Sequence, residues 1–577
     1  MQLPNMPKSL HTCFFMIIHD LFVKVKDLRT RENLEAFSVP SLLSSNPKTI
    51  SSAIVEQGSA SEDWSSSYRL FSQSKWDAED CFDRLLDRGL EHIPKDGTVV
   101  IMADDSLMRK TSINISMTSY MKDPIGPKFQ TNLVIGQRFL EFSLMVFSRN
   151  GEFGRAIPVS FEMIPPKSAE EKREEKRRKV LNAALTDSRK NLAQSENPEE
   201  MLNLRLQMAL LNNLLQKRIP AETVELVQTA EGNGESLEAM LNAAQSKLSG
   251  ILHGKKLLSQ EEIENAASSL SLFFQNQSQE QEVRNTDGMT VGVRESAKRS
   301  TVSEIARARC QKLCAAIKRK RPDVKIVVVA DGGFANQTFL CGNGEEDALP
   351  ADVTVIVRCR KDSSFRNCKE KDGKVQYGET APTPEQLLRD QNVKAETCHV
   401  SVPHGDKKRT VHVKCLENVY WQRVTGKRKG HVLCILSESY NLNKRGRRSR
   451  TSEMYLYVLG ELPPPAKVVE WYLMRWEIEV GFRDQKFGLG LGKAQVWNKQ
   501  SVGKHPAYVV CCYASLLLAS LDAFDGKCPD EMNGPKWDRS FKNRRMSLRS
   551  MLRQLGKEQR SAHEQNGNTV ERQGKAS

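Results

Sequence analysis

The chain has 577 residues, of which 39% are hydrophobic and 27% charged, a composition typical of a soluble globular protein with about two to four domains. Lys and Arg outnumber Asp and Glu by 86 to 71, and the formal net charge of +15 favours a polyanionic partner, either nucleic acid or an anionic membrane surface. The apolar run at 507–521 is shorter than the roughly 20 residues that a membrane span needs, which argues against a membrane protein and predicts a buried helix.

Cysteine usage favours a reducing compartment. The 13 cysteines are scattered and form no paired CxxC sets, and Cys310 and Cys314 lie four residues apart without His partners. The apolar stretch near the start also lacks the basic lead and the cleavage site of an export signal. We expect reduced thiols in the core of a cytosolic protein rather than a zinc site.

The first third of the chain predicts a helical region followed by strands. Residues 1–95 are polar with helical periodicity and contain Trp64 and Trp76. The stretch "GTVVIMADD" at 97–105 is then a β-branched apolar run that ends on acids. Two segments with strand-like alternation follow, "TNLVIGQRFLEFSLMVF" and "RAIPVSFEMI". Three strands are expected here, the first of which ends in carboxylates.

The composition changes at Lys167. From there to about residue 300 the sequence is rich in Ala, Leu, Glu, Lys and Gln, and no aromatic residue occurs between Lys167 and Leu272. This pattern predicts a helical insertion, either a hairpin or a coiled segment, whose charge runs are solvated faces. A lid, a dimerisation arm and a DNA contact remain open as its role.

The second half returns to alternating strands and helices. Buried strands are predicted in "VKIVVVADGGFAN" (324–336), which ends on an acid, and in "ADVTVIVRCRKD" (351–362), and a small antiparallel sheet is predicted within 376–450. The prolines of "ELPPPAK" then open one amphipathic helix, "WYLMRWEIEVGFRDQK" (471–486), which the glycines of "FGLGLGKA" end. The tail from about 525 is basic and weakly patterned.

Three acids from distant parts of the chain form a candidate site: Asp104 or Asp105, Asp331 and Glu479. The first two follow apolar strands, and in an open α/β sheet ligands gather at the carboxyl ends of the strands. Adjacent carboxylates repel unless a cation lies between them, and two divalent cations held by carboxylates are typical of phosphodiester chemistry. The alternative is that "ADD" and "ADGG" are ordinary turn acids.

The helix at 471–486 adds a third element to this hypothesis. At about 100° per residue, Tyr472, Arg475, Glu479 and Lys486 fall within a stripe of roughly 60°, with Trp476 beside it. A solvated face with an Arg475–Glu479 pair would explain the stripe. A surface that faces a metal and a phosphate backbone explains more, with Glu on the cation and the basic residues and Tyr on phosphate or sugar.

The spacing Tyr472-x2-Arg475-x3-Glu479-x6-Lys486 resembles the Y-R-E-K signature of one branch of the DDE transposases of bacterial insertion sequences, the insertion-sequence family numbered four and its relatives. The stretches "RWEIEVGFRDQKFGLG", "VVVADGGFAN" and "VTVIVRCRKDSSF" are also similar to that family. "DWSSSYRLFSQSKW" resembles the helical segment before its first strand. The resemblance covers about residues 50–525.

The resemblance implies an RNase H-like catalytic core, a mixed α/β sheet flanked by helices, with a β-rich insertion between the second and third acids. Asp331 and Glu479 match those two acids. The family pattern Asp-x-Ser selects Asp104 as the first, with Ser106 as the hydroxyl, whereas an alignment one residue later selects Asp105. The three acids would hold two Mg²⁺ or Mn²⁺ ions, and Tyr472, Arg475 and Lys486 would contact phosphates.

Two aromatic residues receive roles from the same resemblance. Trp476 would lie near the scissile strand. Trp421 could stack on a flipped base or belong to the core. The expected domain order is a helical DNA-binding region, core, helical insertion, core, β-rich insertion, core and basic tail, at 1–95, 96–166, 167–300, 301–375, 376–450, 451–525 and 526–577.

The function implied is that of a metal-dependent DNA transposase. It would bind the terminal inverted repeats of its element as a homodimer, cleave their phosphodiesters and join the 3′-OH ends to target DNA, in the cytoplasm at the bacterial nucleoid. Two alternatives stay open: an RNase H-like nuclease without strand transfer, and a catalytically inactive DNA-binding protein derived from a transposase.

Overall fold

The structure is a computed structural model. It describes residues 9–123, 126, 132–149, 151–166, 169–215, 260–280, 301–342, 348–371, 374–401, 408–441, 448–529 and 544–574, with a few positions between 239 and 249. The chain divides into two compact units, one made of residues 1–166 and 300–577 and the other of residues 167–299. Each unit is described by itself.

The second unit is helical and has its own core. Its described helices are α6 (Ala169–Gln194), α7 (Pro198–Leu214) and α10 (Gln260–Glu280). Leucines of α6 and α7 and Ile263 and Leu270 of α10 form one buried cluster. The predicted insertion is therefore a small helical body rather than only a set of solvated faces; its residues 216–238 and 281–300 lie outside the described part.

The first unit begins with five helices: α1 (Leu10–Leu21), α2 (Leu28–Leu43), α3 (Ile50–Gln57), α4 (Ser65–Ser72) and α5 (Ala78–Glu91). They pack around α16 (Ser501–Phe524), the apolar helix that the sequence predicts as buried. Within the described residues α16 is the one helix long and apolar enough to cross a membrane, but 83% of its most apolar window is buried inside the protein. Its apolar surface is thus used in the core.

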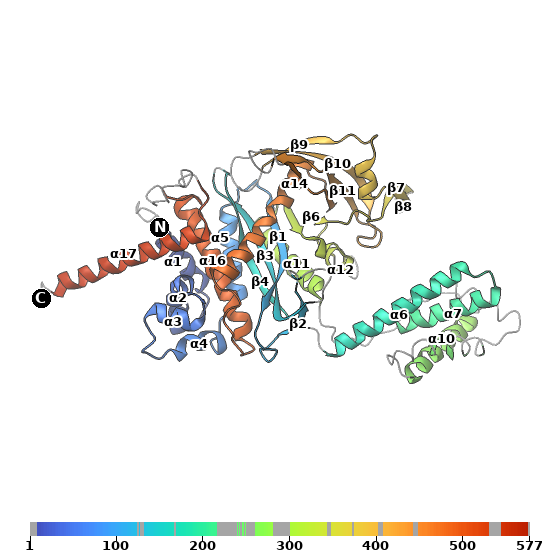
Figure 1. The fold of residues 1–577 in the computed structure, drawn as a ribbon, viewed down its shortest axis with the longest axis horizontal. Coiled ribbons are helices and arrows are strands. Elements are labelled where there is room, and N and C mark those ends of the chain that lie inside the picture. Colours follow the sequence, from blue (N-terminus) through green and yellow to red (C-terminus); the bar gives the residue numbers. More distant parts are fainter. Residues whose placement is uncertain are drawn as a thin grey trace. The chain divides into compact units, whose positions relative to one another are not determined.

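One mixed sheet organises the first unit (Figure 1). The strand order is β2-β3-β1-β5-β6-β14-β11-β10-β7-β8, with β4 paired to β3 and β9 paired to β10. The strands are β1 (Val99–Arg109), β2 (Ser119–Lys122), β3 (Leu133–Phe147), β4 (Gly154–Ile164), β5 (Ile326–Ala330), β6 (Val353–Arg358), β7 (Phe365–Lys371), β8 (Lys374–Ala381), β9 (Glu396–Ser401), β10 (Lys408–Tyr420), β11 (Lys429–Ile435) and β14 (Met454–Leu459). Strands β12 (Ser439–Asn441) and β13 (Arg448–Arg450) form a separate pair.

Helices cover both faces of the β1–β5–β6 centre. Val99 and Ile101 of β1 belong to the same core as α5, α11 (Val302–Lys320) and α16. Val100 and Met102 point to the opposite face and pack with α14 (Pro465–Met474) and α15 (Trp476–Arg483). Short elements complete the unit: η1 (Gly332–Phe334), α12 (Gln337–Leu340) and α13 (Pro384–Arg389).

The antiparallel strands predicted within 376–450 are present as β9, β10 and β11, and they belong to the main sheet. Strand β14 pairs antiparallel with β6, and β11 and β10 continue the same sheet outward. Without β14, the edge of β6 would expose a row of unpaired N–H and C=O groups, so continuing the sheet satisfies them. Residues 402–407 and 442–447 of this region lie outside the described part.

The prediction of a single helix at 471–486 is also wrong in detail. Helix α14 ends at Met474, α15 starts at Trp476, and residues Asp484–Gly488 form one π-helical turn, η2. A break of this kind carries no Pro or Gly signal in "WYLMRWEIEV". Around Arg475 the backbone bonds span three residues, from Arg475 N to Tyr472 O at 3.2 Å and from Ile478 N to Arg475 O at 3.1 Å.

The tail expected to be weakly patterned contains helix α17 (Leu548–Gly574), whereas residues 530–543 lie outside the described part. Met546, Met551 and Leu555 are fully buried in the main core. Just before this helix, Arg545 Nη1 lies 2.6 Å from Glu477 Oε2 of α15. The C-terminal segment therefore supports the helix that carries Glu479.

A cavity substitution tests whether α17 belongs to the core. Met551→Ala should destabilise the protein by about 2–4 kcal/mol, because the buried side chain leaves a cavity. The exposed neighbour provides the control, since Arg549→Ala should stay within about 0.5 kcal/mol of the native protein. Thermal unfolding measures both, and equal melting temperatures for the two variants would show that α17 does not pack there.

Candidate active site

The sheet brings Asp104 and Asp331 to one edge. Strands β1 and β5 are parallel neighbours, and the register pairs Ala103 with Ala330. Asp104 directly follows Ala103, and Asp331 directly follows Ala330, so the two acids lie side by side. The paired stretches at 99–103 and 326–330 are runs of Val, Ile, Met and Ala, which favour a sheet buried on two faces. Strand β1 continues past Asp104 and Asp105 to Arg109, where it still pairs with β3, so the prediction that this strand ends in the acids is wrong. Asp331 is the residue immediately before η1, which begins at Gly332. A side chain at position 332 would be crowded, because its Cβ would lie 3.3 Å from the Arg358 carbonyl oxygen.

Side chains alternate between the two faces of the sheet along β1, so the two candidates for the first acid, Asp104 and Asp105, lie on opposite faces. Val100 and Met102 face α14 and α15, and Asp104 follows with the same parity. Asp105 has the opposite parity and is bound by Arg138, whose Nε and Nη2 donate to its two oxygens at 2.6 and 2.9 Å. Asp104 is therefore the acid that shares a face with Glu479.

Arg475 joins the sheet edge to the helix. Its Nη1 donates to Asp104 Oδ2 at 3.1 Å and its Nη2 donates to Glu479 Oε1 at 2.6 Å. The Arg475 side chain is only 13% exposed, so this is a partly buried ion-pair network rather than the solvated pair considered from the sequence. Burial lowers the pKa of Arg475, but Tyr472, Asp104, Glu479 and Asp331 outweigh it and raise the pKa above its usual value.

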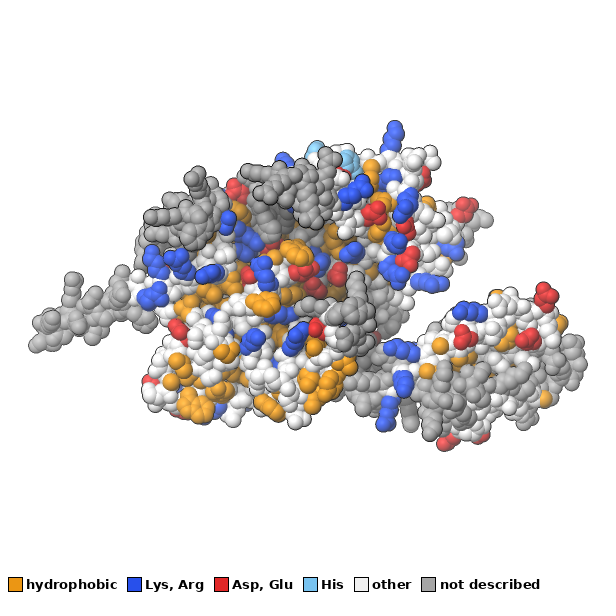
Figure 2. Space-filling model, viewed as in Figure 1, with side chains coloured by type: hydrophobic (Ala, Val, Ile, Leu, Met, Phe, Trp, Pro, Cys, Tyr) orange, Lys and Arg blue, Asp and Glu red, His pale blue; other side chains and the backbone are white. Residues whose placement is uncertain are grey.

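Two of the three acids thus bind one guanidinium group, and the charge of the third, Asp331, acts on it. Figure 2 shows a group of acidic side chains over the middle of the first unit, bordered by Lys and Arg side chains. Burial raises the pKa of the Asp104 carboxyl to about 6; Arg475 opposes the rise, and the negative charges of Asp105 and Asp331 add to it. Asp104 is a carboxylate for which a further nearby cation would be favourable.

Lys486 reaches the same strand from the π-helical turn. Its Nζ donates to Ser106 Oγ, two residues beyond Asp104 on β1. Burial lowers the pKa of the Lys486 ammonium, whereas the charges of Asp104 and Asp105 act to raise it. The extra residue in a π-helical turn rotates Lys486 relative to a regular helix, and in this position it faces the acids.

The two aromatic site candidates lie differently. Tyr472 is 6% exposed and packs in the core beneath the site, with the Arg475 guanidinium carbon 5.8 Å from its ring centroid. Trp476 is 58% exposed at the start of α15. Tyr472 is consequently placed to support Arg475, and Trp476 presents a free ring to the surroundings.

One further residue at the site was missed from the sequence. Glu141 of β3 is 1% exposed and pairs across the strands with Asp104. It accepts hydrogen bonds from Gln485 Nε2 at 2.9 Å and from Ser143 Oγ at 2.8 Å, and burial raises its pKa to about 7. The signal was a lone carboxylate inside the apolar stretch "FLEFSLMVF". Through Gln485, Glu141 anchors the turn that carries Lys486.

The donor set can be tested against a divalent cation. Carboxylate oxygens are the ligands that Mg²⁺ and Mn²⁺ prefer, and Asp104, Asp331 and Glu479 supply them around one positive charge. Among the residues that the structure describes, no three His, Cys, Asp or Glu side chains are close enough together to hold a metal ion. The residues fit the cation in chemistry, and binding requires Arg475 to release Asp104 or Glu479 and the three acids to move closer together.

Comparison with known proteins adds no identity: no family model and no curated protein matches this chain. The Y-R-E-K resemblance therefore stays an interpretation of the residues.

The raised pKa of Asp104 makes a prediction for stability. Its folded-state pKa of about 6 exceeds the ordinary value of 3.8, so the contribution of Asp104 to stability is fully present below pH 3.8 and is lost as the pH rises through 6. Asp104→Asn removes this loss, which is on the order of 2–3 kcal/mol. Its melting temperature should exceed that of the native protein at pH 7.5 and match it near pH 4.

Asp323→Asn, at an exposed turn, is the control and should show no such pH dependence. A lower melting temperature for Asp104→Asn at both pH values would mean that the ion pair with Arg475 outweighs the burial of Asp104.

Proposed function

We propose that this protein is a metal-dependent DNA transposase of the DDE type, which cleaves the ends of its element and transfers the strands to target DNA. One observation carries the proposal. Asp104, Asp331 and Glu479 are far apart in the sequence, yet Arg475 binds Asp104 and Glu479, and Asp331 follows the strand next to that of Asp104 and acts on the charge of Arg475. The carboxyl edge of the strands is where reacting groups collect in open α/β sheets.

In this proposal the three acids hold two Mg²⁺ or Mn²⁺ ions. When bound, the ions activate the attacking oxygen and stabilise the leaving oxygen of the phosphodiester. Asp104 and Asp331 come from rigid neighbouring strands, so their separation is fixed by the sheet. Glu479 comes from α15, which Arg545 and the core hold through Glu477 and Ile478.

The basic side chains of the site would bind the phosphate groups. Lys486 lies beside Ser106 at the acids, where its ammonium could bind a phosphate oxygen. Trp476 offers an exposed ring for the DNA strand. Tyr472 would act from below, by positioning Arg475.

The family resemblance supplies the rest of the proposal. The fold would be RNase H-like, and the protein would act as a homodimer on the terminal inverted repeats, at the nucleoid in the bacterial cytoplasm. The net charge of +15 supports a DNA partner.

A second candidate is a DNA-binding protein without cleavage. The ion pairs of Arg475 with Asp104 and Glu479 favour it, because they already neutralise two of the acids. An RNase H-like nuclease without strand transfer has the same acids. An assay of cleavage and joining on DNA that carries the element ends distinguishes the three functions.

Glu479→Gln tests the role of the third acid. Gln preserves the shape of the side chain but removes the charge that holds a divalent cation, so DNA binding should survive while cleavage falls by several orders of magnitude. In the native protein, Mg²⁺ should also raise the melting temperature, and this rise should be lost in the variant.

Glu461→Gln is the matched control, since this exposed glutamate lies at the opposite edge of the sheet, next to Lys325. Near-native cleavage by Glu479→Gln would refute the proposed role. DNA binding without cleavage by the native protein, and without a thermal response to Mg²⁺, would support the second candidate.

Lys486→Ala tests the phosphate contact. Each lost contact lowers the slope of log affinity against log salt concentration by about 0.9 for duplex DNA. The variant should therefore show a slope smaller by about one unit, measured by fluorescence anisotropy between 50 and 200 mM KCl. Lys325→Ala, at the opposite edge, should keep the native slope, and an unchanged slope for Lys486→Ala would place its ammonium away from the DNA.

A further inference from the structure

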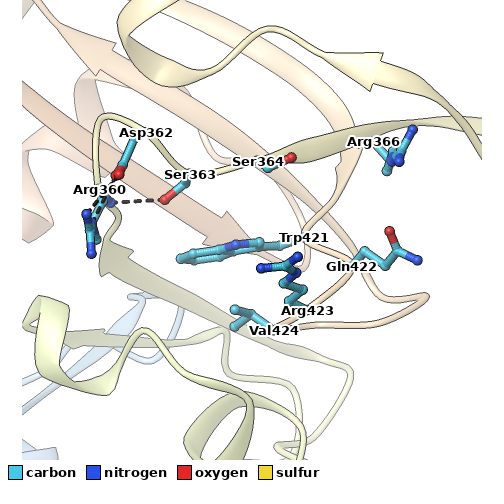
Figure 3. A pocket seen from close by; sticks show the side chains of 9 residues that line it. All are labelled: Arg360, Asp362, Ser363, Ser364, Arg366, Trp421, Gln422, Arg423 and Val424. Atoms are coloured by element: carbon cyan, nitrogen blue, oxygen red, sulfur yellow. Dashed lines mark hydrogen bonds and ion pairs between the residues drawn. The ribbon is translucent and has the colours of Figure 1, made fainter. Parts of the chain in front are cut away.

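A basic pocket lies outside the acid cluster, beyond the carboxyl end of β6 (Figure 3). It has a volume of about 450 Å³, and its charged lining consists of Arg360, Arg366, Arg423 and Asp362. In Figure 3, Arg360 and Arg366 lie toward opposite ends of the pocket, with Trp421 and Arg423 between them. Three guanidinium groups against one carboxylate give the lining an excess positive charge.

The guanidinium groups of the pocket are held to different degrees. Arg360 forms a bidentate pair with Asp362, at 2.9 and 2.8 Å, and Arg366 Nη1 donates to Thr380 Oγ1 at 2.9 Å. Arg423 makes no ion pair or hydrogen bond within the described part of the chain. An anion that enters the pocket thus meets two oriented cations and one that is free to turn toward it.

The wall that carries Arg423 is rigid. The amides of Val424 and Thr425 both donate to the Trp421 carbonyl oxygen at 2.7 Å, and the Thr425 hydroxyl lies 3.0 Å from the Tyr457 hydroxyl. Arg428 also donates to the Leu340 carbonyl oxygen at 3.1 Å. The turn between β10 and β11 is consequently fixed to the core, which lowers the cost of ordering it on binding.

Trp421 is mostly buried. It is 9% exposed, and its ring contacts Phe365 and Tyr457 at centroid distances of 5.3 and 5.1 Å. These contacts favour the alternative in which Trp421 belongs to the core, and its remaining surface lines the pocket. The charged groups of the pocket are therefore its main polar feature.

The pocket lies on the same sheet edge as the acids. Strand β6 is the parallel neighbour of β5, so the segment after Arg358 leaves the sheet beside Asp331. The carbonyl oxygen of Arg358 is the close neighbour of Gly332, and Arg358 also acts on the pKa of Tyr472. Arginines therefore continue from the acids along the edge into the pocket. Figure 2 shows further Lys and Arg side chains over the region of β7, β10 and β11.

We propose that this pocket binds backbone phosphates of a DNA strand that extends from the acids along the sheet edge, with Arg360, Arg366 and Arg423 as the contacts. The inference rests on the proposed function for its choice of DNA as the polyanion. It adds a binding site, independent of base sequence, that is distinct from Lys486 and Arg475.

The test replaces two of the arginines together. Arg366→Gln with Arg423→Gln, made in full-length protein that also carries Glu479→Gln, allows binding to be measured without cleavage. Loss of two phosphate contacts should reduce the salt slope for duplex DNA by about 1.8, so that the affinity ratio between parent and variant shrinks about tenfold from 50 to 200 mM KCl. The control is Arg319→Gln with Lys325→Gln at the opposite sheet edge, which should keep the parent slope.

Each outcome decides the inference. If the double variant keeps both the melting temperature and the salt slope of the parent, the pocket does not bind DNA phosphates and the inference is wrong, whether or not the native protein cleaves DNA. Conversely, a reduced slope supports the pocket even if the native protein fails to cleave, in which case only the transposase proposal falls. If thymidine monophosphate stabilises the parent and not the variant while the DNA slopes are equal, the pocket serves a free nucleotide and the inference is wrong.

Discussion

The contacts of Arg475 connect the parts of the molecule on which the candidate site depends. Asp104 belongs to the sheet and Glu479 to α15, and their shared guanidinium is a direct polar link between these two layers at the sheet edge. Three carboxylates in partly buried surroundings would repel one another without a positive charge among them. The fold can hold them together because one cation is built into the chain at the break between α14 and α15.

The same constraint explains the surroundings of the site. The buried Tyr472 ring lies under Arg475, Arg545 fixes α15 through Glu477, and Glu141 holds the π-helical turn through Gln485. These contacts come from β3, from the segment before α17 and from the core, so the position of Glu479 depends on distant segments of the chain. A substitution in the C-terminal segment can therefore act on the site without touching it.

The acids could be picked out from the sequence because each of the two strands has a clear pattern in its own residues. "VVIMADD" and "VVVAD" are β-branched runs that end on a carboxylate, and their parallel pairing follows from the general arrangement of α/β sheets. The centre of the charge network was not predictable in this way. Arg475 looks like one member of a helical stripe, and only the break at this residue and the register of β1 show that it joins two layers. The continuation of β6 by β14 and the packing of α17 were missed for a related reason, since both depend on contacts between residues far apart in sequence.

The insertion between β4 and α11 has a consequence for synthesis. Asp331 follows Asp104 by 227 residues (331 − 104), so at roughly 5–20 residues per second the ribosome needs about 11–45 s to deliver the second acid after the first. During that interval β3 can cover one side of β1, but the side that receives β5 is an open, apolar strand edge. The helical unit made in the meantime buries its own leucines in a core of its own. Nascent chains are thus exposed to edge-to-edge association for the longest time at the strand that carries Asp104, and a chaperone that shields strand edges would act most usefully there.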